Sequence, residues 1–136
     1  MIIGAKGLTS TYTIKDINAF NCTCRVNISG FNLIGYTGMT IVGCTRADIT
    51  NCQRTTSGGF GITVESSFCS INGCAISNAS QAITVQSQST VFSNSNSGTG
   101  NGLVLVAQSA STIAKYSTQP TGTTAEVVTS GGVIRS

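Results

Sequence analysis

A repeat of short apolar segments dominates the middle of this chain. The segments Ile62–Val64, Ile83–Val85 and Val104–Val106 follow one another at one fixed interval. Repeats of this length are typical of solenoids, in which each unit buries its apolar face only by stacking on its neighbours. The repeat therefore predicts a stack of similar coils along the chain.

Two columns of apolar residues run through the repeat in step. One extra residue between Val42 and Ile71 shifts both columns together, which indicates a common structural register. The first column is Val42, Val64, Val85, Val106 and Val127, and the second is Ile28, Ile49, Ile71, Phe92, Ile113 and Ile134.

The units have the pattern of strands. Each is too short for two helices and lacks a 3.6-residue periodicity, whereas Val, Ile and Thr alternate as they do in strands. Ile62 and Val64 would face inward, with Thr63 and Glu65 outward. Three short strands joined by turns make one coil, and parallel crossovers are normally right-handed. We therefore expect an all-β fold, a right-handed parallel β-helix of about five to six coils of roughly 21 residues.

The length of 136 residues suggests a single domain. Residues 1–18 fit the repeat poorly, so we expect an N-terminal capping segment there and the parallel β-helix over residues 19–136. In the third strand, apolar inward candidates become fewer toward the C-terminus.

Some positions expected to face outward are apolar, and exposed apolar rows favour contact with a partner. The alternative is an ordinary scatter of surface hydrophobic residues. A short rod with a modest core also favours oligomerisation. The apolar outward candidates are Phe20, Ile41, Val91, Leu105 and Val133.

Composition excludes several classes of protein. Seven basic and four acidic residues give a net charge of +3, too small and too scattered to favour nucleic acid. No apolar run reaches the roughly 18 residues of a membrane span. The start of the chain lacks the apolar core of a signal peptide, so we expect no self-directed secretion.

The six cysteines lack the spacing of a zinc site, since no Cys-x-x-Cys pair and no His are present. We expect free, core-filling thiols and no cofactor or metal. Cys52 and Cys74 should stack on neighbouring coils, close enough for a disulfide, although parallel side chains disfavour the bridge torsion.

The acidic residues do not form a catalytic pair on the predicted β-helix. Glycoside hydrolysis usually uses two carboxylates at a defined separation, whereas Asp48 and Glu65 fall on different faces. We therefore expect no enzymatic activity from this chain. Arg25 and Arg46 are one repeat apart and should stack, where they could hold an anionic sugar or phosphate. Asp48 could instead neutralise Arg46, and a solvated edge is the simpler alternative.

The segments Gly61-Ile62-Thr63-Val64 and Ser70-Ile71-Asn72-Gly73-Cys74, with their Ser-, Asn-, Thr- and Gly-rich spacers, resemble the β-helix of bacteriophage tailspikes and tail fibres. Pectate-lyase-like β-helices share this style. The resemblance implies a homotrimer of parallel rods in a virion, assembled in the bacterial cytoplasm and attached to host-surface glycan. It places no catalytic residue on this sequence.

These observations give two hypotheses. The first is a structural and trimerisation segment of a phage-type tail spike or tail fibre that contacts host-surface glycan, with Arg25, Arg46 and Asp48 as the candidate glycan-binding residues. The alternative is a secreted or surface β-helix module that binds or processes polysaccharide.

Overall fold

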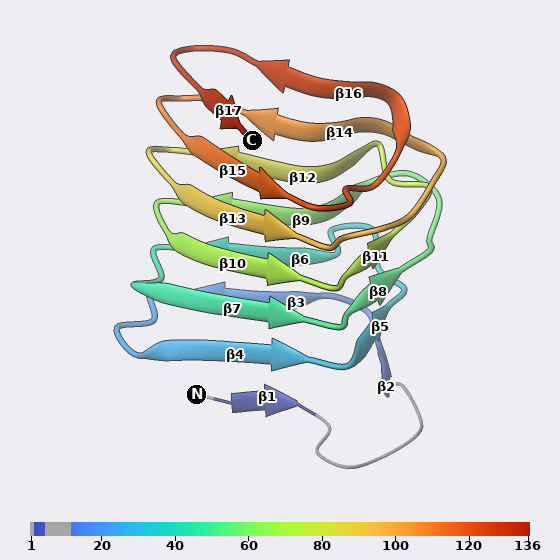
Figure 1. Ribbon diagram of the computed structural model, residues 1–136. Helices are drawn as coiled ribbons and strands as arrows, with labels where there is room; N and C mark the ends of the chain where they lie inside the picture. The colour runs from blue at the N-terminus through green and yellow to red at the C-terminus, as the bar shows by residue number, and fades with distance from the viewer. Residues whose placement is uncertain (1, 5–11) are drawn as a thin grey trace.

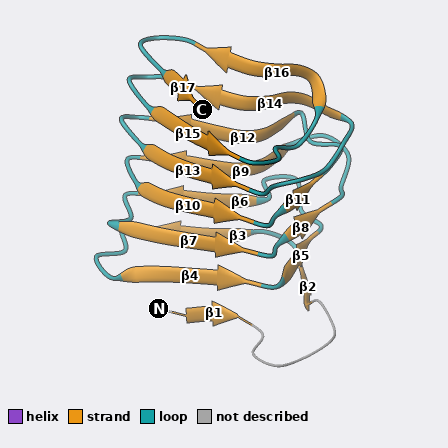
Figure 2. Ribbon diagram, viewed as in Figure 1, coloured by secondary structure: helices purple, strands orange, loops and turns teal. Residues whose placement is uncertain are grey.

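A computed structural model describes residues 2–4 and 12–136 of the chain. This part is all-β, with strands wound into a parallel β-solenoid of about six turns (Figure 1). No helix occurs within it, as Figure 2 shows. The coils wind right-handed from the N-terminus upward in Figure 1. The predicted fold class is therefore confirmed.

Three parallel sheets form the walls of the rod. The first has seven strands, β1 (Ile2–Gly4), β4 (Arg25–Ser29), β7 (Arg46–Thr50), β10 (Phe68–Asn72), β13 (Thr90–Asn94), β15 (Thr112–Tyr116) and β17 (Val133–Arg135). The second has six, β3 (Ile17–Phe20), β6 (Met39–Val42), β9 (Phe60–Glu65), β12 (Gln81–Gln86), β14 (Asn101–Ala107) and β16 (Gly122–Val128). The third has four, β2 (Tyr12–Ile14), β5 (Phe31–Leu33), β8 (Gln53–Arg54) and β11 (Ala75–Ile76).

Each coil passes through the six-stranded sheet, then the seven-stranded sheet, and then the four-stranded sheet (Figure 1). The four-stranded sheet ends at β11, and the later coils add no further strand to it. The expected weakening of the third strand toward the C-terminus is therefore confirmed. Of the predicted N-terminal capping segment, residues 1 and 5–11 lie outside the described residues, and the boundary at residue 18 stays a prediction.

The first predicted column is wrong at Val42 and again from Val106 onward. Ile41, not Val42, pairs with Val64, and Ile41 is buried. Val85 pairs with Ala107, whereas Val106 pairs with Thr84. The repeat length at this wall therefore varies from coil to coil, as the pairs 41–64, 64–85 and 85–107 show.

The second predicted column is correct for Ile28, Ile49 and Ile71, which pair in register. It is wrong at Phe92, because Ser93 pairs with Ile71 and Phe92 faces outward. Beyond that point the column continues through different partners. Ile113 is buried but belongs to the neighbouring column, where it pairs with Val91 on one side and Ile134 on the other.

One additional residue at the corner after β12 explains why the side chains of β13 face the opposite way from the prediction. The turn after β9 has one left-handed residue, Ser66 at φ 46°. The turn after β12 has two, Ser87 at 57° and Gln88 at 61°. Since side chains alternate between the faces of a strand, one additional corner residue turns Val91 inward and Phe92 outward.

The predicted outward apolar row is also largely wrong. Ile41, Val91 and Leu105 are buried, because each lies one position away from its expected face. Val133 is half-buried. Phe20 is the member of the row that is plainly exposed, at 57%.

The cysteines follow the core-filling expectation with exceptions near the N-terminal end of the rod. Four of them are buried, namely Cys44, Cys52, Cys69 and Cys74. Cys22 is half-buried, and Cys24 is exposed, so the core-filling expectation is wrong for Cys24.

Polar side chains inside the corners complete the packing. Ser67, Ser89 and Ser111 are buried one above the other, and each hydroxyl accepts a backbone N–H from the coil before it, at 2.8 to 3.2 Å. Asn96 accepts the N–H of Cys74 at a second corner in the same way, at 2.9 Å. These ladders satisfy backbone groups that would otherwise be buried without partners.

Candidate functional site

The three residues predicted to bind glycan come together on the outer face of the seven-stranded sheet. Arg25 and Arg46 are register partners on β4 and β7, as the repeat predicts. Arg25 Nε lies 2.5 Å from Asp48 Oδ2, and Arg46 Nη2 lies 3.3 Å from Asp48 Oδ1. One carboxylate therefore neutralises both guanidinium groups in part.

Burial alone would raise the pKa of Asp48, but hydrogen bonds from Arg46 and Arg25 outweigh it and lower that pKa. The carboxylate is thus ionised at neutral pH and occupied by its two partners. An anionic ligand at this cluster would have to compete with Asp48. Glycan binding by these three residues stays a prediction.

A row of aromatic rings continues from this cluster along the rod. The guanidinium of Arg46 lies 5.6 Å from the centre of the Phe68 ring. Phe68 and Phe92 are 5.5 Å apart, and Phe92 and Tyr116 are stacked at 6.3 Å with their planes 14° apart. Because these rings pack against one another, the row holds neighbouring coils together, while Phe92 and Tyr116 remain 37% and 50% exposed.

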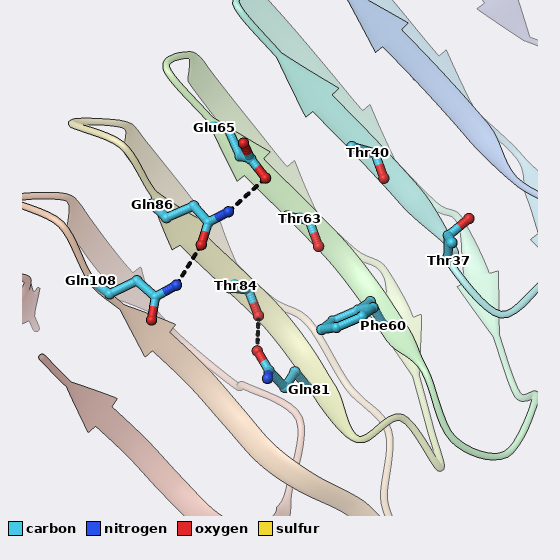
Figure 3. A pocket seen from close by; sticks show the side chains of 9 residues that line it. All are labelled: Thr37, Thr40, Phe60, Thr63, Glu65, Gln81, Thr84, Gln86 and Gln108. Carbon is cyan, nitrogen blue, oxygen red and sulfur yellow. Dashed lines mark hydrogen bonds between the residues drawn. The ribbon is translucent and has the colours of Figure 1, made fainter.

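A groove on the outer face of the six-stranded sheet has a different character. Its volume is about 420 Å³. It runs across β6, β9 and β12 to the end of β14 (Figure 3). The lining residues are Thr37, Thr40, Phe60, Thr63, Glu65, Gln81, Thr84, Gln86 and Gln108.

A ladder of side-chain hydrogen bonds forms one side of the groove. Gln86 Nε2 donates to Glu65 Oε1 at 2.6 Å, and Gln108 Nε2 donates to Gln86 Oε1 (Figure 3). The three residues come from three successive coils and are half-buried. The ladder fixes the rotamers of long side chains that would otherwise lose entropy when they bind a ligand.

Hydroxyl groups and one aromatic ring form the rest of the lining. Thr40, Thr63 and Thr84 are register partners on three adjacent strands, and Thr84 Oγ1 donates to Gln81 Oε1 at 2.7 Å. Phe60 is the register partner of Gln81 and lies beside it in Figure 3. The groove thus combines an exposed ring with hydroxyl, amide and carboxylate groups.

Phe60 is held in place by the buried Arg54. Arg54 is 1% exposed, and its guanidinium donates to the carbonyl oxygens of Thr56 at 2.8 Å and Gly58 at 2.5 Å. It also donates to Tyr36 O at 3.4 Å, and the same oxygen accepts the N–H of Phe60 at 2.9 Å. Arg54 therefore fixes the loop from which Phe60 enters the groove.

Sequence reasoning missed this groove, although a signal is present. Glu65, Gln86 and Gln108 follow one another by about one repeat each, which places them on adjacent coils. The threonine column could not be predicted from the repeat, because the repeat places Ile41 rather than Thr40 on the outer face. With Thr40 correctly placed, three threonines align.

Within the described residues, no helix is long and apolar enough to cross a membrane. The same residues contain no group of three or more His, Cys, Asp or Glu side chains that could hold a metal ion. Comparison with protein-family models, curated proteins and solved structures finds no match to this chain.

Proposed function

We propose that this chain is a structural segment of a phage-type tail spike or tail fibre, and that the groove on its six-stranded sheet binds host-surface glycan. The observation that carries the proposal is the pre-arranged lining of the groove, in which Phe60 faces the Glu65–Gln86–Gln108 ladder across a row of threonines. The phage origin rests on the style of the repeat. The solenoid architecture supports a mechanical role, because backbone hydrogen bonds run along the whole rod.

The lining suits a sugar. An aromatic ring can pack against the apolar face of a pyranose, while amide and carboxylate groups hydrogen-bond its hydroxyls. Glu65 is the sole charged residue among those that line the groove. The ligand class that fits is therefore a neutral or amino sugar, since an anionic sugar would meet the Glu65 carboxylate and no lining residue of opposite charge.

The residues that line the groove favour binding of a glycan without its cleavage. Hydrolysis of a glycosidic bond usually takes two carboxylates flanking that bond. The groove lining supplies Glu65 alone, and Glu126 is paired with Lys115 at 2.5 Å. We therefore propose attachment to glycan and no enzymatic turnover by this chain.

The assembly that we propose is a homotrimer of parallel rods in the virion, formed in the bacterial cytoplasm before release. Large apolar side chains remain exposed on the single chain, among them Tyr36 at 64% and Phe20 at 57%. Burying such side chains between chains would stabilise a trimer. Light scattering of the purified protein should give three times the mass of one chain.

A glycan array tests the binding. Wild-type protein should bind neutral or amino glycans, and Phe60→Ala should bind the same glycans about two- to tenfold more weakly, since aromatic contacts contribute roughly 0.5–1.5 kcal/mol. Phe20→Ala is the matched control, because Phe20 is exposed on the same sheet but does not line the groove. Equal loss in both variants, or no binding by wild type, would contradict the proposal.

A specific outcome would favour the alternative. A monomer that binds glycan through the groove would indicate a secreted or surface β-helix module that binds polysaccharide. The exposed aromatic residues would then have no role in a trimer, whereas the groove would keep its role.

A further inference from the structure

Four cysteines stand at the corners where other coils carry hydrogen-bonding ladders. Cys22 and Cys44 precede Ser67 in the serine column, and Thr45 N donates to Cys22 O at 3.0 Å. Cys52 and Cys74 precede Asn96 at a second corner, and Ala75 N donates to Cys52 O at 2.9 Å. Each pair therefore spans two adjacent coils in register.

The Cys52–Cys74 pair is enclosed in the interior. The two residues are 3% and 0% exposed, and their side chains are hydrogen-bonded to each other. Both thiols also lie near backbone carbonyls, Cys52 Sγ at 3.4 Å from Thr50 O and Cys74 Sγ at 3.7 Å from Asn72 O. Strands stacked about 4.8 Å apart hold paired Cα atoms within the roughly 4.4–6.8 Å range of disulfides. The two parallel side chains would have to turn toward each other to reach the bridge torsion.

We propose that Cys52 and Cys74 are an oxidation site, at which hydrogen peroxide converts the two free thiols into a disulfide that ties the coil of β8 to the coil of β11. Such a bond would replace, at these two coils, the hydrogen-bonded ladder that Asn96 provides one coil later. It would add a covalent link between coils that are otherwise joined by backbone hydrogen bonds.

The reaction balances with one peroxide for each disulfide. The thiolate of Cys52 attacks one peroxide oxygen, the O–O bond breaks, and the departing hydroxide takes a proton to form water. The product is a sulfenic acid at Cys52. The sulfur of Cys74 then attacks the sulfur of Cys52, the S–O bond breaks, and the hydroxyl leaves with the proton of Cys74 as a second water. Both sulfurs are oxidised by one electron, and peroxide is reduced by two.

The surroundings of Cys52 favour the first step. A hydrogen bond from Cys74 lowers the pKa of Cys52 to about 7, against the opposing effect of burial, and the backbone N–H groups of Phe31 and Gly30 act in the same direction as Cys74. The hydrogen bond with Cys52 and burial raise the pKa of Cys74, and the charge of the nearby Cys69 acts in the same direction, so Cys52 is the thiol that attacks peroxide. The thiolate is the reactive form, so Cys52 is poised at neutral pH.

The first corner provides an internal comparison. Burial and a hydrogen bond with Cys44 raise the pKa of Cys22. The two pairs share the same placement on adjacent coils, and each has one thiol of raised pKa, Cys22 in the first pair and Cys74 in the second. Cys52 is the thiol whose pKa is lowered. Cys52 and Cys74 should therefore be oxidised before Cys22 and Cys44 at neutral pH.

Peptide mapping of the intact protein tests the proposal. The folded chain is treated with one equivalent of hydrogen peroxide at pH 7, remaining thiols are alkylated in denaturant, and the protein is digested with trypsin. Trypsin cleaves after Arg46, Arg54 and Lys115, so Cys52 and Cys74 fall in the separate peptides 47–54 and 55–115. A crosslink of these peptides, lighter than their sum by two hydrogen atoms and lost on reduction, is expected.

Two variants identify the partner. Cys69→Ala removes the other cysteine of peptide 55–115 and should keep the crosslink, whereas Cys74→Ala should abolish it. The rate of crosslinking should reach half its maximum near pH 7 in the folded protein. In the denatured chain that midpoint should rise to about 8.5, the ordinary pKa of a thiol.

Three outcomes would overturn the proposal. Cys52 and Cys74 could both be recovered alkylated, or the crosslink could disappear with Cys69→Ala. Folded and denatured chains could also show the same pH midpoint. If Cys74→Ala does not fold, the wild-type map and the Cys69→Ala variant still decide.

Discussion

At the scale of single residues, Arg54 shows how a charge can serve in the interior of a solenoid. It takes a column position between Leu33 and Ile76, which are both buried. Its guanidinium donates to carbonyl oxygens of the loop that follows it. No spacing rule in the sequence indicates which carbonyl oxygens Arg54 binds.

Replacing Arg54 with Met should destabilise the fold by about 2–4 kcal/mol, because the carbonyls of Thr56 and Gly58 lose their charged donor. Urea denaturation measures the change. Arg54→Lys, which keeps the charge but loses the forked geometry, should recover part of the loss. If Arg54→Met is as stable as wild type, the loop does not depend on the guanidinium.

For the arginine cluster, the sequence predicts one contact and misses another. The pairing of Arg25 with Arg46 follows from a fixed repeat, and the structure confirms it. Asp48 forms ion pairs with both arginines across two strands. The spacing of the residues in the sequence does not predict this shared pairing.

At the scale of elements, the strands follow from the alternation of Val, Ile and Thr, whereas their register depends on the corners. An added corner residue shifts every following side chain to the opposite face. Left-handed conformations at Ser87 and Gln88 accommodate this residue. Serine and glutamine are not strong signals for such conformations. The repeat in the sequence therefore predicts the wrong faces for Phe92 and Val91.

Glycine at a corner offers a test of close stacking. Gly98 has φ +124°, and a Cβ atom there would lie 1.8 Å from Ile76 O on the coil below. Gly98→Ala should therefore cost about 2–5 kcal/mol through backbone strain and a clash with backbone. Thermal denaturation would report it as a lower melting temperature.

Gly30 provides the matched control. It also has positive φ, at +77°, but nothing lies within 4 Å of the position that an added methyl group would take. Gly30→Ala should cost only the strain of the left-handed region, about 1–2 kcal/mol. Equal losses at the two glycines would show that close contact between coils is not what requires Gly98.

At the scale of the whole molecule, the two broad sheets of the rod present different surfaces. The seven-stranded sheet carries an ion-paired cluster and stacked aromatic rings, which bind to one another across coils. The six-stranded sheet carries a groove whose polar lining is fixed by hydrogen bonds. The overall architecture could be predicted from the repeat, but the choice of candidate face could not, because it depends on the register of β6.

The most direct test of the central claim is an NMR titration of the folded protein with an oligosaccharide selected on the array. We predict that the backbone amide signals of Phe60, Thr63, Thr84 and Gln86 shift together as the sugar is added, while those of Arg25 and Asp48 stay in place. Shifts confined to the Arg25–Asp48 cluster would contradict the account, because the glycan would then bind the seven-stranded sheet and leave the groove empty.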